Sequence, residues 1–124
     1  MKLRRRRRKA PEPAADPTGV EVTHVGGTEV WAVDGEIDIA TKARLRTVLD
    51  AVPRSDGPLV LDLAGVTFMD STGISAMLAI DRAARESGRR LAIVCPEGPV
   101  RLILAVTGVE EQLPLYPTRA AALA

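Results

Sequence analysis

Residues 59–78 read Leu59-Val-Leu-Asp-Leu-Ala-Gly-Val-Thr-Phe-Met-Asp-Ser-Thr-Gly-Ile-Ser-Ala-Met-Leu78, and the rest of the chain is arranged around them. The run Leu59-Val60-Leu61 is apolar without alternation, which is typical of a strand covered on both faces. A tight connection and then a helix starting near residues 70–73 are expected next. The helix is indicated by apolar residues at helical spacing, namely Ile74, Met77, Leu78 and Ile80.

Polar residues stand at the expected helix start, where backbone N–H groups lack partners. Asp70, Ser71 and Thr72 are residue types that commonly cap such groups, so a plain cap is the simple interpretation. The alternative is that Ser71 carries a phosphoryl group, because a phosphate there meets the free N–H groups and the positive end of the helix dipole. It would add roughly two negative charges beside Asp70 and repel an acidic partner surface. The residues alone leave both interpretations open.

Two segments carry a resemblance to a known family. Leu61-Asp-Leu-Ala-Gly-Val-Thr-Phe-Met-Asp-Ser-Thr-Gly-Ile74 closely resembles the strand, turn and helix signature of STAS-domain anti-sigma factor antagonists. Val33-Asp-Gly-Glu-Ile-Asp-Ile-Ala-Thr41 resembles the family's Gly-Glu-Leu/Ile-Asp segment. The resemblance maps the family's phosphorylated serine onto Ser71 and favours the phosphorylation hypothesis. Thr72 stands where many relatives have Ser, so it is a second candidate acceptor.

The resemblance covers about residues 18–124 and implies an α/β fold. We expect a single STAS-type domain there, with a mixed, largely parallel β-sheet, an N-terminal hairpin and about four helices packed on the sheet. It further implies an anti-sigma factor antagonist that binds an anti-sigma factor with serine kinase activity and so releases a sigma factor. Phosphorylation of Ser71 would break the complex, and a PP2C-type phosphatase would restore it. The implied partner-binding residues are Glu36, Asp38, Asp70, Ser71, Thr72 and Gly73.

The N-terminal half predicts a hairpin and a first helix. Val20, Val22 and His24 alternate with polar residues, which predicts a strand with one wet face. Gly26-Gly27 predicts the hairpin turn, and the returning strand 29–34 should break at Gly35. Residues 36–39 are then expected to form a loop. Thr41 is the predicted cap of a helix that runs to about Val52. Its expected inner face consists of Ala43, Leu45, Val48, Leu49 and Val52.

The C-terminal half predicts alternating helices and strands. The central helix should reach about Ser87 and stop at Gly88. A strand over 91–94 and a helix over 100–106 are expected next, with Leu102, Ile103 and Val106 facing inward. A short edge strand over 113–116 should follow, because Pro114 lacks a backbone donor. Thr118 is then the predicted cap of a small final helix.

Residue types with chemical potential give little support to catalysis. Glu36 and Asp38 form a carboxylate pair, but no third metal ligand is apparent. Ser71 does not lie in a Gly-x-Ser-x-Gly motif, and His24, the lone histidine, is a weak candidate for a general base. Cys95 is predicted to be buried and inert, and one cysteine forms no internal disulfide. We therefore expect no catalytic residues, no cofactor and no metal.

Charge divides the chain into two parts. The first nine residues hold seven Lys or Arg and no acid, and a Pro-rich segment follows, so residues 1–17 are predicted to be a disordered Arg-rich and Pro-rich tail. The tail has no apolar h-region typical of a secretory signal, and no run is long enough for a membrane span. A cytoplasmic protein without specific nucleic-acid binding is expected. The tail could still weakly contact nucleic acid or an anionic membrane.

Two other functions remain open at this level. The first is a STAS scaffold that is never phosphorylated and serves a transporter or lipid-trafficking complex. The second is an enzyme of unknown type that uses Ser71 or Cys95. Stable copurification with membrane ATPase subunits would mark the scaffold, and a turnover lost on mutation of either residue would mark the enzyme.

Overall fold

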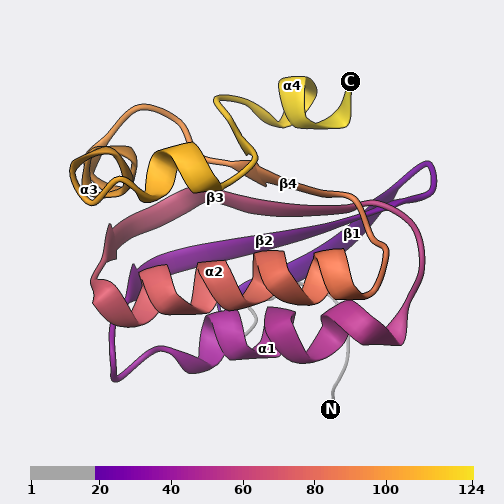
Figure 1. Ribbon diagram of the computed structural model, residues 1–124, viewed down its shortest axis with the longest axis horizontal. Helices are drawn as coiled ribbons and strands as arrows, with labels where there is room; N and C mark the ends of the chain where they lie inside the picture. Colours follow the sequence, from indigo (N-terminus) through magenta and orange to yellow (C-terminus); the bar gives the residue numbers. More distant parts are fainter. Residues whose placement is uncertain (1–18) are drawn as a thin grey trace, which may run out of the picture.

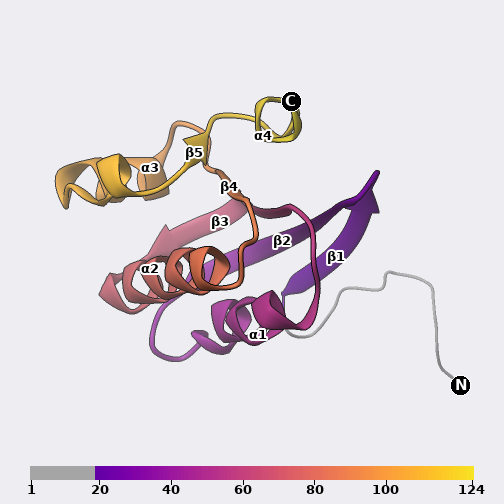
Figure 2. The same ribbon diagram turned by 45° about the vertical axis from the view of Figure 1, so that its right-hand side comes forward.

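One five-stranded sheet organises residues 19–124, which are the residues that this computed structural model describes (Figures 1 and 2). The strand order follows the chain; β1 and β2 pair antiparallel and every other neighbouring pair is parallel. The expected mixed, largely parallel sheet is therefore confirmed. The predicted tail over residues 1–17 lies outside the described residues. The strands are β1 (Val20–Val25), β2 (Thr28–Ile37), β3 (Leu59–Met69), β4 (Leu91–Val94) and β5 (Leu115–Tyr116).

Helices cover the two faces of the sheet unequally. The larger core joins one sheet face to the first three helices, and its members include Leu45, Met77 and Leu104. The last helix covers a smaller apolar strip on the other face through Ala122. The helices are α1 (Ala43–Ala51), α2 (Ser71–Glu86), α3 (Pro99–Val106) and α4 (Arg119–Leu123), with short 3-10 turns at Val52–Arg54 and Val109–Gln112.

The central strand is longer than expected and runs directly into α2. β3 ends at Met69 and α2 begins at Ser71, so only Asp70 separates them and no further connection exists. α2 ends at Glu86, close to the predicted end, and Gly88 adopts a left-handed φ of 71°. Because a single residue connects the strand to the helix, α2 begins directly at the end of β3.

The predicted break at Gly35 is wrong, because β2 continues to Ile37. Gly35 adopts a φ of 85°, which glycine tolerates, and the pairing of β2 with β3 shifts register on either side of it. β2 therefore contains a local shift in its pairing with β3 and continues past it. As a result Glu36 and Ile37 are strand residues beside the end of β3, not loop residues.

The hairpin at Gly26-Gly27 is confirmed, but the buried face expected for β1 is not. Val20 is buried, whereas Val22 and Val25 are largely exposed. β1 is an edge strand, and α1 packs over β2, so the hairpin extends past the helical cover (Figure 1).

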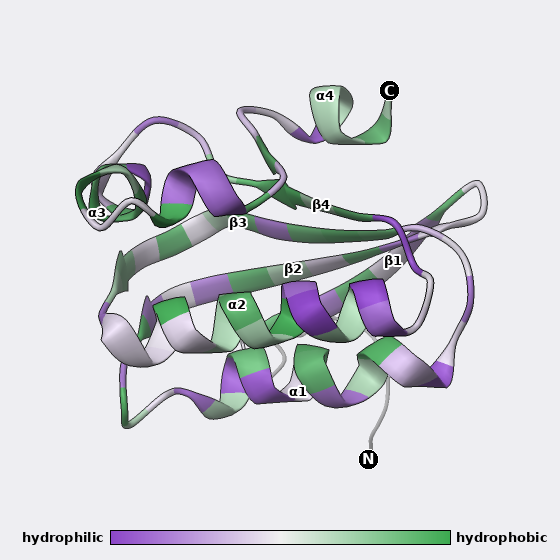
Figure 3. Ribbon diagram, in the orientation of Figure 1, coloured by the Kyte–Doolittle hydropathy of each residue, from purple (hydrophilic) through white to green (hydrophobic). Residues whose placement is uncertain are grey.

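Three expectations about helix faces and caps are also wrong. Ala43 of α1 is exposed, while Leu45, Val48 and Val52 are buried as predicted. Thr41 does not cap α1 and instead closes the preceding loop. In α3 the inward pair is Val100 and Leu104, and the predicted inward residues Leu102 and Val106 are 63% and 77% exposed. α3 is largely apolar around its circumference (Figure 3), so periodicity could not select its inner face.

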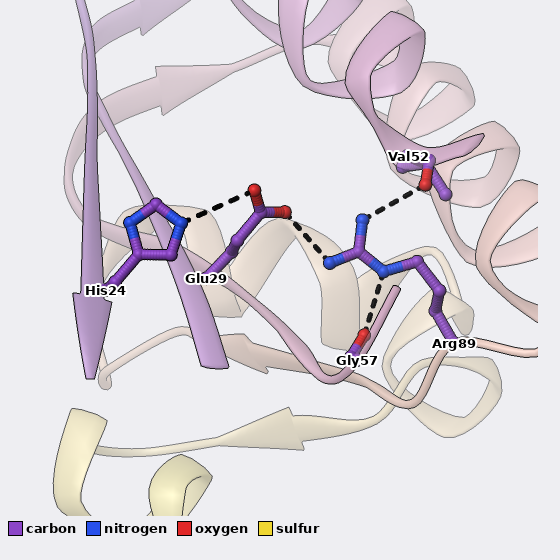
Figure 4. Close-up of polar contacts among 5 residues, drawn as sticks. All are labelled: His24, Glu29, Val52, Gly57 and Arg89. Atoms are coloured by element: carbon purple, nitrogen blue, oxygen red, sulfur yellow. Dashed lines mark hydrogen bonds and ion pairs between the residues drawn. The ribbon is translucent and has the colours of Figure 1, made fainter. Parts of the chain in front are cut away.

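A buried arginine, Arg89, connects the segment after α1 with the start of β2 (Figure 4). The Arg89 guanidinium donates to the carbonyls of Val52 and Gly57 and to the Glu29 carboxylate, at 3.0, 2.8 and 2.8 Å. In the sequence Arg89 and Arg90 are adjacent, and no local pattern shows that the first is buried and the second exposed. The burial of Arg89 follows from partners that lie far apart along the chain.

Candidate functional site

The candidate residues meet where β2 and β3 end side by side. Ile37 pairs with Met69, and the Asp70 N–H donates to the Ile37 carbonyl at 3.1 Å. Glu36 lies opposite Phe68 in the same ladder. The two segments predicted to contribute to the site, 36–38 and 70–73, are therefore neighbours in the fold, as expected from the resemblance.

Asp70 caps α2 in the manner predicted. Its backbone is extended, and its carboxylate accepts a hydrogen bond from the Thr72 N–H at 2.9 Å. Its carbonyl accepts from the Ile74 N–H at 3.1 Å. These bonds leave Ser71 as the first helical residue, with an exposed side chain, whereas Thr72 is half-buried. The cap thus presents the Ser71 hydroxyl to solvent at a fixed position.

Gly73 is required by close packing at the same turn. A Cβ at this position would lie 2.5 Å from Met69 Cγ and 2.9 Å from Ile37 Cγ2. Those atoms belong to the last residues of β3 and β2, so the absence of a side chain lets α2 approach the ends of both strands. Gly73 is a positioning residue for the turn and is itself buried.

The loop after β2 is held by its own polar groups. The Asp38 carboxylate accepts from the backbone N–H groups of Ala40 and Thr41, each at 3.0 Å. The Thr41 hydroxyl accepts from the Asp38 N–H at 3.0 Å and donates to the Glu36 carbonyl. Asp38 therefore shapes the loop, while the Glu36 side chain is exposed. Nowhere in residues 19–124 do three or more His, Cys, Asp or Glu side chains form a group that could hold a metal ion.

Two exposed apolar residues adjoin the candidate residues and were missed by sequence reasoning. Ile39 follows Asp38 and is 73% exposed, and Phe68 precedes the Met69-Asp70 pair and is 45% exposed. Such side chains are common anchors of protein interfaces when they lie together with polar groups. We call Glu36, Asp38, Ile39, Phe68 and residues 70–73 the strand-end surface.

A groove between α1 and α2 opens beside this surface. Its volume is about 400 Å³, within the range of ligand-binding clefts. Thr72 belongs both to the groove and to the strand-end surface. Sequence reasoning missed the groove, because residues from two helices line it. They are Lys42, Ala43, Arg46, Leu49, Thr72, Ser75 and Ala76.

Neither His24 nor Cys95 is suited to assist catalysis at Ser71. His24 lies beside Glu29, which pairs with Leu59 at the start of β3, whereas Ser71 follows the end of that strand. At about 3.3 Å per residue the ten steps of β3 span roughly 33 Å, so His24 is too far away to act as a base for Ser71. Burial raises the pKa of the Cys95 thiol, which disfavours its thiolate nucleophile. Neither residue supports an enzyme centred on Ser71.

Comparison with known proteins identifies the family. The model of the STAS domain matches residues 19–122. The chain belongs to the STAS domain family. No helix within residues 19–124 has both the length and the apolar character needed to cross a membrane.

Similar STAS proteins include named regulators. The chain is 28% identical over 106 residues to the anti-sigma F factor antagonist of Paenibacillus polymyxa, and the alignment covers 84% of this chain and 91% of the relative. It is 30% identical over 107 residues to the anti-sigma-F factor antagonist RsfB of Mycobacterium tuberculosis, covering 85% and 86%. The crystal structure of an anti-sigma factor antagonist from Mycobacterium paratuberculosis superposes with a TM-score of 0.74 at 30% identity, over 88% of this chain and 95% of that one.

Proposed function

We propose that this chain is an anti-sigma factor antagonist whose binding is switched off by phosphorylation of Ser71. The observation that carries the proposal is the exposed Ser71 hydroxyl at the first position of α2, on a turn fixed by Asp70 and Gly73. Relatives that cover most of the chain are named antagonists of anti-sigma factors. The unmodified protein would bind an anti-sigma factor and thereby release a sigma factor.

Ser71 is the better acceptor of the two hydroxyls. Its side chain is exposed, whereas Thr72 is half-buried and its N–H is bound by Asp70. A phosphoryl group on Ser71 would lie at the positive end of a 16-residue helix, so the fold can accept it. Thr72 remains the second candidate.

The strand-end surface is the proposed contact with the partner. Its polar part would consist of Glu36, Asp38, Asp70, Ser71 and Thr72, with Gly73 positioning the turn beneath them. Ile39 and Phe68 would supply apolar anchors. A phosphate of roughly two negative charges in the middle of this surface would need to be desolvated on binding, next to Asp70. The modified protein would therefore dissociate.

The proposed partners are an anti-sigma factor with serine kinase activity and a PP2C-type phosphatase, acting in the cytoplasm. In this scheme Ser71 is the substrate hydroxyl of the kinase, and the chain itself supplies no catalytic residue, cofactor or metal. The alternative of a scaffold that is never phosphorylated would use the same fold without this modification.

Binding measurements on two Ser71 variants test the proposal. The anti-sigma factor kinase of the same organism is titrated with the parent, Ser71→Ala and Ser71→Asp proteins by calorimetry, first without ATP. We expect Ser71→Ala to bind like the parent and Ser71→Asp to bind about tenfold or more weakly. With ATP added, the parent should be released and Ser71→Ala retained. Equal affinity of Ser71→Asp and the parent would contradict the electrostatic account.

A further inference from the structure

The groove between α1 and α2 has a chemical character distinct from the strand-end surface. Its described lining contains two cationic side chains, Lys42 and Arg46, and no carboxylate. The remaining lining residues are apolar or carry a hydroxyl: Ala43, Leu49, Ala76, Thr72 and Ser75. The groove thus offers positive charge beside an apolar floor.

The groove begins next to Ser71, because the neighbouring residue Thr72 lines it. α1 and α2 lie side by side on one face of the sheet (Figures 1 and 2). Lys42 and Ala43 belong to the start of α1, and Thr72 and Ser75 to the first turns of α2. The groove therefore begins at the same end of the molecule as the strand-end surface and continues it along the two helices.

We propose that the groove receives an acidic amphipathic segment of the anti-sigma factor. Carboxylates of that segment would pair with Lys42 and Arg46, and an apolar side chain would lie on Leu49 and the two alanines. This inference rests on the proposed function and specifies which chemistry of the partner the antagonist recognises. The two cations of the lining, which complement carboxylates, and continuity with the strand-end surface support it.

The cationic side chains are available for such a partner. Lys42 is exposed. Arg46 pairs with Asp50 one helical turn away, at 3.1 Å, but both side chains are more than half exposed. Exposed pairs of this kind are held weakly, so Arg46 can exchange Asp50 for a carboxylate of the partner without a large loss.

The groove also gives phosphorylation a second means of breaking the complex. A phosphoryl group on Ser71 would lie next to Thr72, at the open end of the groove. There it would attract the same cationic side chains and repel the carboxylates of the incoming segment. Occupation of the groove and phosphorylation of Ser71 would then exclude each other.

Charge reversal in the groove tests the inference. The probe is the purified anti-sigma factor kinase of the same organism, without ATP. Lys42→Glu/Arg46→Glu is compared with Arg54→Glu/Arg90→Glu, a matched double reversal of two exposed arginines near the start of β3, at the other end of the sheet. We expect the groove variant to bind about tenfold or more weakly, and the control within about twofold of the parent. The salt dependence of the Kd should also become shallower in the groove variant alone.

A milder variant guards against misfolding. Lys42→Ala/Arg46→Ala removes the charges without adding like charge beside Asp50, and thermal melting checks that each variant is folded. Affinity within about twofold of the parent in both groove variants would overturn the inference. If the parent nevertheless binds the kinase and is released by ATP, the proposed function survives that result. If the parent does not bind the kinase at all, the proposed function fails and the inference fails with it.

Other occupants give different results. A second copy of the chain in the groove would appear as self-association that the groove variant loses, with its kinase affinity unchanged. An anionic membrane would appear as loss of binding to phosphatidylserine vesicles, again with unchanged kinase affinity. Either result would overturn the proposal.

Discussion

Replacement of Arg89 by methionine tests how much the contacts of this buried side chain with the segment after α1 and with β2 stabilise the fold. The side chain is 2% exposed, and its guanidinium satisfies the carbonyls of Val52 and Gly57 together with the carboxylate of Glu29 (Figure 4). Arg89→Met fills similar space and makes none of these bonds. It leaves Glu29, which is only 16% exposed, beside the His24 imidazole at 3.7 Å and without its arginine partner.

The expected loss of stability is large for a single substitution. Removing one partner of a buried ion pair costs about 3–5 kcal/mol, because the other charge stays desolvated. Glu29 keeps some contact with solvent, so we expect the free energy of unfolding to fall by about 3 kcal/mol. For a domain of this size that corresponds to a decrease of roughly 12 °C in the melting temperature. Urea denaturation and thermal melting followed by circular dichroism measure both quantities.

The pH dependence identifies the Glu29 pair as the cause. Burial alone would raise the pKa of Glu29, but the hydrogen bond and charge of Arg89 outweigh burial and hold that pKa below its ordinary value of 4.5. The pair therefore stabilises the fold fully above pH 4.5, and this stability is lost as the pH falls through the lowered pKa. The difference between the parent and Arg89→Met should be largest near neutral pH and shrink in acid.

The neighbouring Arg90 provides the control. It is exposed, so Arg90→Met should change the free energy of unfolding by less than about 0.5 kcal/mol. A loss below about 1 kcal/mol in Arg89→Met, or a loss that does not change between pH 7 and pH 3, would refute the reasoning.

Three further predictions concern the cap and the close packing at the turn beside Ser71, and the buried Cys95 thiol. Asp70→Ala removes the cap of α2 and should cost about 1 kcal/mol in chemical denaturation, whereas Asp70→Asn should lose much less. Gly73→Ala should also cost about 1 kcal/mol net, since overpacking against Met69 and Ile37 exceeds the gain in helix propensity, and a more stable variant would contradict the close packing. The Cys95 thiol should react slowly with Ellman's reagent at pH 8 and quickly in urea, because burial raises its pKa and blocks access; equal rates would contradict this.

Local patterns in the sequence predicted the main elements well. The apolar run from Leu59 and the helical spacing after Asp70 define β3 and α2, and the glycine pair at Gly26 defines the hairpin. The cap at Asp70 was predicted because capping depends on neighbours two residues away. The neighbouring positions of segments 36–38 and 70–73 were anticipated through the family resemblance.

Features that depend on distant contacts were not predictable in the same way. Arg89 is buried because of partners up to 60 residues away, which a local basic pair does not indicate. The inner face of α3 was assigned wrongly, since Leu102 and Leu104 are equally apolar and only packing on the sheet distinguishes them. The groove beside Thr72 arises from two helices and leaves no local signal in either.

The most direct test of the central claim is the mass of the protein after incubation with the anti-sigma factor kinase of its organism and ATP. Fragmentation across residues 59–82 locates any modification. We predict one phosphoryl group on Ser71, with the modified protein dissociated from the kinase and Ser71→Ala unmodified and bound. A phosphoryl group on Thr72 alone would move the site by one residue. A protein that stays unmodified while bound to the kinase would contradict the proposed switch and favour a passive scaffold.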